Sequence, residues 1–230
     1  MKSTHHNTAE KVVTSCRRCG ICCKKGGPAF HQIDRPLIEN GLIQIRYLYT
    51  IRKGELVRDP IRGSILPVDS ELVKIKSKAD EGTCTFYDDL NEKCQIYTDR
   101  PIECQLLKCW DTRSLEEMYE QDRLSREDLL ADVAGLWELA VEHEQRCGYS
   151  RMGDLISRLK KGYRKHLADE VGAIIAYDNH LRQLVIEKGQ IEPETLDFIF
   201  GRSLKHTIEL FGVRLQQVKG KIIMTTSGLP

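Results

Sequence analysis

The sequence predicts a helix-rich α+β protein in which a small cysteine-bearing region with short strands packs on a helical C-terminal half. Two observations lead to this fold class. Short β-branched and aromatic runs, separated by turn residues, occupy part of the first half of the chain. Beyond Asp111 the apolar residues instead recur every three or four positions, which is the period of an amphipathic helix.

Size and composition are those of a globular protein. The chain of 230 residues is long enough for one large domain or two small ones. With 40% hydrophobic and 30% charged residues, it is not a mostly disordered chain. No run approaches the roughly 18 apolar residues that a membrane helix needs, and the polar N-terminus lacks the apolar centre of a secretory signal. We therefore expect a cytoplasmic protein with no membrane partner.

The change of pattern along the chain predicts three parts. These are a polar leader at residues 1–15, a cysteine-cluster metal-binding domain at residues 16–112 and a helical C-terminal region at residues 113–230.

Short strands are expected within the cysteine domain. The segment from Leu42 to Lys76 predicts two to four of them, because the runs Leu42–Ile45 and Tyr47–Ile51 are rich in strand-forming residues and are followed by Gly and Pro turn signals. A hairpin is predicted with Thr83–Tyr87 and Lys93–Tyr97 as its arms. That hairpin would bring Cys84 and Cys94 close together.

Three helices are expected after the cysteine domain. The first follows the stripe from Leu129 to Val141, and Ser125 with Asp128 three positions later marks its start. The second follows the stripe from Leu155 to Ile175, and the third runs from Pro193 to about Leu215, with proline at its first position. The final run, Lys221 to Thr225, is expected to be a short strand or an ordered tail.

The cysteines are the main functional signal. The chain has nine, and eight of them precede Asp111. Because the total is odd and no secretory signal is seen, thiolate ligation of a metal explains them better than disulfides do. The ninth, Cys147, lies among helical residues and is expected to be a packed thiol.

The first cysteine group is Cys16, Cys19, Cys22 and Cys23. Its first three members match the C-x2-C-x2-C run of bacterial ferredoxins, whose fourth ligand comes from elsewhere in the chain. Gly20 suits such a loop because a residue without a side chain lets backbone amides approach the sulfur atoms. Basic residues would offset the charge of the thiolates: Arg17, Arg18, Lys24 and Lys25.

The second group is Cys84, Cys94, Cys104 and Cys109. The two groups together could fill two four-ligand centres, or one centre with spare thiols such as Cys23 or Cys109. Crowding of ligands in one loop favours an iron-sulfur cluster. Zinc is the alternative, because structural zinc sites take two separated pairs of ligands and spacing allows such pairs here.

Other candidate residues carry weaker signals. Arg100 is a candidate cofactor-binding residue, because its planar guanidinium could hydrogen-bond a cluster sulfur, a cofactor carboxylate or a nearby aspartate. The alternative for Arg100 is a structural salt bridge at the start of a helix that begins at Pro101. His31 is a minor ligand candidate, whereas His5 and His6 are expected in solvent.

Charge is distributed unevenly although the net charge is only +1. Residues 1–78 contain 15 Lys and Arg against 7 Asp and Glu, and residues 79–111 contain 3 against 8. Either these segments neutralise one another in the fold, or the first forms a basic face for an anionic partner or cofactor. The balance gives no clear signal for nucleic-acid binding.

Two motifs together resemble a known family. The segment Cys16-Arg17-Arg18-Cys19-Gly20-Ile21-Cys22-Cys23, followed by Cys94-Gln95-Ile96-Tyr97-x2-Arg100-Pro101-x2-Cys104, resembles the YkgJ-like cysteine-cluster family of CxxCxxCC proteins. The resemblance covers Cys16 to Cys109 and implies a domain that chelates zinc or iron. The family includes the flagellin lysine N-methylase, which implies a 4Fe-4S cluster and S-adenosylmethionine-dependent methyl transfer. No match to that enzyme is seen outside the cysteine region.

The sequence therefore predicts a metal-binding cysteine-cluster protein that holds a 4Fe-4S cluster. Its expected role is electron transfer, metallo-enzyme assembly or a modification reaction, with another protein as redox partner or modification substrate. The alternatives are a structural zinc-binding interaction module and an S-adenosylmethionine-dependent protein N-methyltransferase. The predicted ligands are Cys16, Cys19, Cys22, Cys23, Cys84, Cys94, Cys104 and Cys109.

Overall fold

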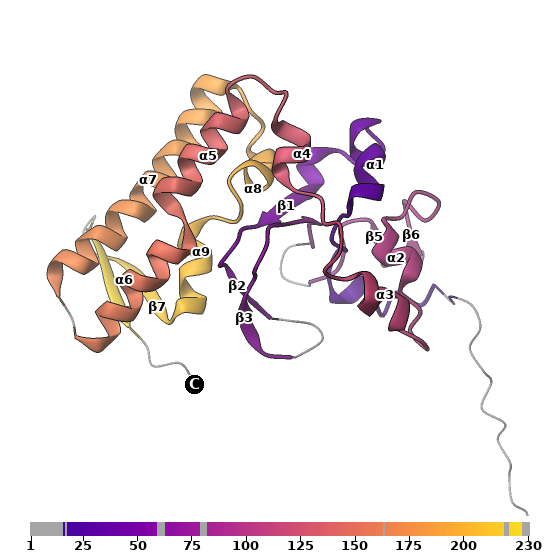
Figure 1. Cartoon of the computed structure of the whole chain (residues 1–230), viewed down its shortest axis with the longest axis horizontal. Coiled ribbons are helices and arrows are strands. Elements are labelled where there is room, and N and C mark those ends of the chain that lie inside the picture. The colour runs from indigo at the N-terminus through magenta and orange to yellow at the C-terminus, as the bar shows by residue number, and fades with distance from the viewer. Residues whose placement is uncertain are drawn as a thin grey trace, which may run out of the picture.

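The structure, a computed structural model, describes residues 16, 18–58, 63–78, 82–162, 164–218 and 221–226. The predicted leader, with His5 and His6, lies outside the described residues, as does Arg17. The fold is α+β and rich in helix, as predicted (Figure 1). Short antiparallel strand pairs lie in the cysteine region, and the longer helices lie in the C-terminal half.

Four strands form in the predicted Leu42–Lys76 window. β1 (Leu48–Ile51) pairs with β4 (Leu72–Ile75), and β2 (Leu56–Arg58) pairs with β3 (Ile65–Pro67). The predicted strand at Leu42–Ile45 is wrong. The buried Ile43 donates its backbone N–H to Leu37, and the chain then turns into the 3-10 helix η3 (Ile45–Tyr47).

Short helices complete the cysteine region. In chain order they are η1 (Cys23–Lys25), η2 (Gln32–Asp34), α1 (Arg35–Glu39), α2 (Ile102–Leu106) and α3 (Arg113–Met118). The helix expected at Pro101 is therefore present as α2, with Pro101 as its N-cap.

The predicted hairpin is present but short. β5 (Tyr87–Asp88) pairs with β6 (Lys93–Cys94), and Tyr87 lies opposite Cys94. Cys84 does not extend this ladder because it pairs with Ser77. The Asp88 carboxylate closes the turn, since it accepts the backbone N–H groups of Leu90 and Asn91 at 3.0 and 3.2 Å.

Two of the predicted helices are each divided in the structure. The first stripe forms α4 (Arg126–Leu130) and α5 (Leu136–Cys147), separated by Gly135, whose φ of +77° cannot continue a right-handed helix. The second stripe forms α6 (Tyr149–Lys161) and α7 (Lys165–Gly189), with the break after Lys161. Because α6 and α7 fold back and bury their apolar faces against each other, the stripe keeps its helical period across the break.

The third predicted helix, from Pro193 to Leu215, is largely wrong. Glycines with positive φ at positions 201 and 212 interrupt it. The chain instead forms η4 (Pro193–Thr195), α8 (Leu196–Ile199), α9 (Leu204–Thr207), η5 (Ile208–Phe211) and β7 (Val213–Val218). β7 pairs with β8 (Lys221–Thr226), so the predicted strand at Lys221–Thr225 is confirmed.

The main core is shared by the cysteine region and the helical half. Phe30 and Leu48 from the first pack in one buried cluster with Leu181 and Phe198 from the second. A smaller core lies between α6, α7 and α9. The main core thus crosses the predicted boundary between residues 112 and 113.

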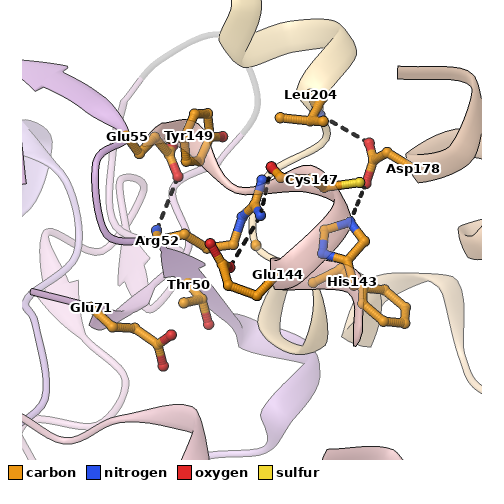
Figure 2. A network of polar contacts seen from close by, with 12 residues as sticks. Thr50, Arg52, Glu55, Glu71, His143, Glu144, Cys147, Tyr149, Asp178 and Leu204 are labelled. Carbon is orange, nitrogen blue, oxygen red and sulfur yellow. Dashed lines mark hydrogen bonds and ion pairs between the residues drawn. The ribbon is translucent and has the colours of Figure 1, made fainter. Parts of the chain in front are cut away.

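A buried polar network also joins the cysteine region to the helical half (Figure 2). Arg52, which is fully buried at the end of β1, donates from Nη1 to Glu144 Oε2 at 3.1 Å and to the Cys147 carbonyl at 3.2 Å, both in α5. Thr50 donates its hydroxyl to the Phe198 carbonyl at 2.7 Å. Hydrogen bonds therefore join β1 to two helices of the C-terminal half.

Within the described residues, none of the helices has both the length and the apolar character that crossing a membrane requires.

Candidate metal centre

The first cysteine group lies on a tight loop. Cys16, Cys19 and Cys22 are exposed and Cys23 is half-buried. The backbone N–H of Arg18, which has a φ of +57°, donates to Cys16 Sγ at 3.4 Å. Gly20 has a φ of +73°, and a Cβ built at this position would lie 2.0 Å from the hydroxyl of Tyr87. Glycine is therefore required here for its backbone conformation and for the close approach of the Tyr87 ring.

Backbone and carboxylate hydrogen bonds bring the second group to this loop. Cys84 donates its N–H to the Cys23 carbonyl at 2.7 Å. Cys94 lies in the hairpin opposite Tyr87, whose ring contacts the loop at Gly20. Cys104 lies in α2, whose first N–H is bound by Asp34 at 2.8 Å.

Glu103, the neighbour of Cys104, further fixes α2. It is buried and accepts the Ala29 N–H at 2.7 Å. Sequence patterns gave no indication that Glu103, Asp34 or Tyr87 belong to the site. Only the position of Glu103 directly before a predicted ligand could have drawn attention to it.

Five thiols form one group, which we call the inner thiols. They interact electrostatically with one another, and the sulfur atoms of Cys22 and Cys23 lie 3.9 Å apart. Cys84 and Cys94, which the hairpin was predicted to bring together, lie within electrostatic range of each other. Cys16, Cys19 and Cys109 are outside this group and, like Cys22, are exposed at the surface. The inner thiols are Cys22, Cys23, Cys84, Cys94 and Cys104.

The ionisation of the inner thiols is uneven. The hydrogen bond from Cys23 lowers the pKa of Cys22 to about 6, and the same bond together with burial raises the pKa of Cys23. Burial raises the pKa of Cys84, Cys94 and Cys104. Ionisation is thus favoured at Cys22, and positive charge close to the other inner thiols would favour it there as well.

Two basic residues lie beside the inner thiols. Arg100 is within electrostatic range of Cys22 and Cys94, and its Nε donates to the Tyr97 carbonyl at 2.8 Å. Arg100 makes no ion pair with a carboxylate in the part of the chain that the structure describes, which speaks against a structural salt bridge. Lys74 lies near Cys84 and Cys104, and burial lowers its pKa.

His31 and Cys147 both have partners within the fold. His31 was a minor ligand candidate, but it is buried with Nδ1 bonded to the Gln121 carbonyl at 2.7 Å and Nε2 to Glu103 at 3.3 Å. Since both ring nitrogens already have protein partners, this candidate is wrong for the fold as it stands. Cys147 is fully buried with its sulfur 3.8 Å from the Ile174 carbonyl, so the expected packed thiol is confirmed.

The donor set suits a thiolate-bound metal. Soft sulfur ligands select zinc, copper(I) or iron-sulfur clusters over hard cations. A bound cation would also stabilise the thiolates that burial disfavours. Among the described residues, no three His, Cys, Asp or Glu side chains are already close enough to one another to hold a single ion. The chemistry of the donor set fits the group, and the inner thiols are the residues that would hold it.

Comparison with known families agrees with this chemistry. Residues 15–125 match the family described as "CxxCxxCC: Putative zinc- or iron-chelating domain". This part of the chain is similar to the CxxCxxCC family. The match contains all eight predicted ligands and extends through α3. It confirms the family resemblance and supports metal binding by this region. No curated protein and no solved structure matches the chain.

Proposed function

We propose that the protein holds a 4Fe-4S cluster at the inner thiols. The observation that carries this proposal is that thiols from four separate chain segments lie within electrostatic range of Cys22 or of one another: the loop, the bridge at Cys84, the hairpin and α2. Packing alone does not require thiols from four segments to lie in one region of the fold.

Two features favour an iron-sulfur cluster as the bound group. Cys22 belongs to the C-x2-C-x2-C run, which is typical of iron-sulfur ligation when a remote cysteine completes the set. The other members of the run, Cys16 and Cys19, are exposed on the same loop and lie outside the inner thiols. Cys104 and Cys84 provide remote thiols that interact with Cys22. When bound, such a cluster supplies one-electron redox chemistry. Its protein ligands set the potential through charge, hydrogen bonds and solvent exposure.

The cluster would serve electron transfer, metallo-enzyme assembly or a modification reaction on a partner protein. The exposure of the cysteine loop favours a partner protein for each of these three roles. Cys19 and Cys22 are exposed, so a partner can approach to within a short distance of the centre.

Metal and sulfide analysis after anaerobic purification tests this proposal. We expect iron and acid-labile sulfide in about equal amounts, a visible absorption band and a paramagnetic signal after reduction. Cys104→Ser should abolish the cluster, whereas Cys147→Ser, which removes a buried thiol outside the site, should retain it. A colourless wild-type protein with one zinc and no sulfide would overturn the iron-sulfur assignment.

Zinc is the second candidate, and one distance favours it. The sulfur atoms of Cys22 and Cys23 are 3.9 Å apart. Tetrahedral zinc with ligands at about 2.3 Å places sulfur atoms about 3.8 Å apart. In that case the domain is a structural interaction module, and chelation should unfold the cysteine region while no redox signal is seen at any stage.

A further inference from the structure

The ring of Tyr97 lies between two arginine side chains. The guanidinium carbon of Arg100 is 3.7 Å from the ring centroid, and that of Arg18 is 4.1 Å from it. Two guanidinium groups at these heights would overlap if they shared one face of the ring. They therefore cover opposite faces, and Tyr97 is the middle layer of a three-layer stack.

This stack joins the two cysteine groups. Arg18 belongs to the loop between Cys16 and Cys19, and its own N–H donates to Cys16 Sγ. Arg100 lies between Cys94 and Cys104 in the chain, and its Nε is held by the Tyr97 carbonyl. Stacking on a common ring thus fixes the loop to the segment that carries the remote thiols.

The stack contains two positive charges and no carboxylate. Neither arginine forms an ion pair with Asp or Glu in the described segments of the chain. The terminal nitrogens of Arg100 also have no hydrogen-bond partner among these residues. Two like charges on one ring repel each other, and the cation–π contacts offset this only in part. The arrangement therefore suits an anionic group nearby.

The thiols beside the stack can supply that negative charge once a metal is bound. Arg100 is within electrostatic range of Cys22 and Cys94. Four thiolates that hold one divalent ion carry a net charge of −2, and four thiolates around a 4Fe-4S core of charge 2+ carry the same. The two guanidinium groups together carry +2, which is equal in size and opposite in sign to this charge.

We propose that Arg18, Tyr97 and Arg100 form a charge-compensating clamp that closes the cysteine loop over a dianionic metal–thiolate centre. This inference rests on the proposed metal centre and adds residues to it. Arg100 stabilises the thiolates directly, and Arg18 draws the loop onto Tyr97. Metal binding and loop closure are therefore coupled. The negative metal–thiolate centre offsets the repulsion between the two arginines, and the arginines offset the negative charge of the centre.

Cobalt(II) titration of the reduced full-length protein under anaerobic conditions tests the clamp. Sulfur-to-cobalt charge-transfer absorption reports thiolate ligation, and competition with a chromophoric chelator gives the dissociation constant. We expect Arg18→Gln and Arg100→Gln each to raise that constant roughly tenfold, as loss of an outer-shell partner does. Arg100→Lys keeps the charge and should bind more tightly than Arg100→Gln.

The matched control is Arg151→Gln. Arg151 is an exposed arginine of α6 that pairs with Glu170, and its loss should leave cobalt affinity unchanged. High salt should narrow the difference in cobalt dissociation constant between wild type and Arg100→Gln, because dissolved ions screen the charge of Arg100. The metal-free Arg100→Gln protein should be no less stable than wild type in urea, because it has lost one of two repelling charges.

The results separate the clamp from the metal centre itself. Wild-type protein that binds no cobalt through its thiols would overturn the proposed function. Wild-type protein that binds cobalt while both glutamine variants bind it equally well would overturn the clamp alone. A lower urea midpoint of metal-free Arg100→Gln, with a salt-independent loss of affinity, would also overturn it, because a purely structural contact behaves in that way.

Discussion

Gly20 and Gly41 have almost the same backbone conformation and very different surroundings. Their φ angles are +73° and +72°. A Cβ at Gly20 would lie 2.0 Å from the Tyr87 hydroxyl, whereas a Cβ at Gly41 would have no atom within 4 Å. The pair therefore separates the effect of backbone conformation from the effect of side-chain contact.

We predict that Gly20→Ala destabilises the protein more than Gly41→Ala does. Each substitution places alanine in the left-handed region, which costs about 1–2 kcal/mol. Only Gly20→Ala also displaces Tyr87, which adds about 1–3 kcal/mol and moves the cysteine loop. Urea unfolding measures the first effect and metal content the second. Equal losses of stability with unchanged metal content would contradict this prediction.

Single residues show what the sequence could indicate about the site. The two-residue spacings identified the loop, and Gly20 was expected to let backbone amides approach the sulfur atoms. The sequence could not identify Tyr87 as the neighbour of Gly20, because a contact between distant segments depends on the fold. His31 failed as a ligand for the same cause. Its partner Glu103 is brought to it only in the fold, where the Glu103 side chain also accepts the Ala29 N–H.

At the scale of elements, the start of α4 is the clearest success of sequence analysis. Ser125 Oγ accepts the Asp128 N–H at 3.3 Å, and the Asp128 carboxylate accepts the Ser125 N–H at 2.8 Å. Gln32 also donates to Asp128 at 2.9 Å, so this helix start is tied to the cysteine region. A capping box is local in sequence, and local chemistry is what a sequence records best.

We predict that Ser125→Ala lowers the free energy of unfolding by about 1 kcal/mol and Ser125→Gly by a few tenths. Loss of the hydroxyl leaves the Asp128 N–H without its acceptor. Ser157, which is exposed within α6, provides the control, since Ser157→Ala should be neutral or slightly stabilising. Urea unfolding of the metal-free protein compares them. A Ser125→Ala protein as stable as wild type would refute the role of this cap.

The ends of the other elements were not predictable in this way. Apolar period indicates which face of a helix is buried, and this held for both divided helices. It does not indicate where the chain reverses, because α6 and α7 bury the same kind of face on either side of their turn. β7 was assigned to a helix because its strand character depends on pairing with β8, which follows it in the chain.

At the scale of the whole molecule, the buried pair of His143 and Asp178 links stability to pH (Figure 2). His143 Nε2 lies 2.8 Å from Asp178 Oδ1, and neither side chain is exposed. Burial lowers the pKa of His143. Although burial opposes it, the hydrogen bond from His143 and the charge of Arg182 hold the pKa of Asp178 at about 2. A neutral imidazole therefore donates to a carboxylate in the folded protein.

We predict that this histidine makes the fold sensitive to mild acid. The unfolded chain binds a proton at His143 near pH 6.5, and the folded chain does so only at lower pH. The stability is fully present above pH 6.5 and is lost as pH falls toward the folded pKa, by up to about 1.4 kcal/mol per pH unit. Urea unfolding of metal-free wild type and His143→Gln at pH 8, 6.5 and 5 measures it. Parallel decline of both proteins would contradict the assignment to His143.

The shared core and the Arg52 network predict that the two halves unfold together. The chain has two tryptophans: Trp110 lies next to Cys109 in the cysteine region, and Trp137 packs against the main core from α5. In Trp137→Phe, fluorescence reports only Trp110, while far-ultraviolet circular dichroism reports mainly the helices of the other half. Because both signals come from the same variant, any effect of the substitution on stability is the same for both.

We expect the fluorescence and dichroism midpoints of Trp137→Phe to coincide in urea, as they do for a single cooperative unit. The physical reason is that opening either half exposes the other half's share of the core, including Phe30 and Phe198, and separates Arg52 from Glu144. If residues 16–112 formed an independent domain, Trp110 would report a separate transition. A Trp110 midpoint clearly below the dichroism midpoint would then show that the buried network does not couple the cysteine region to the helices.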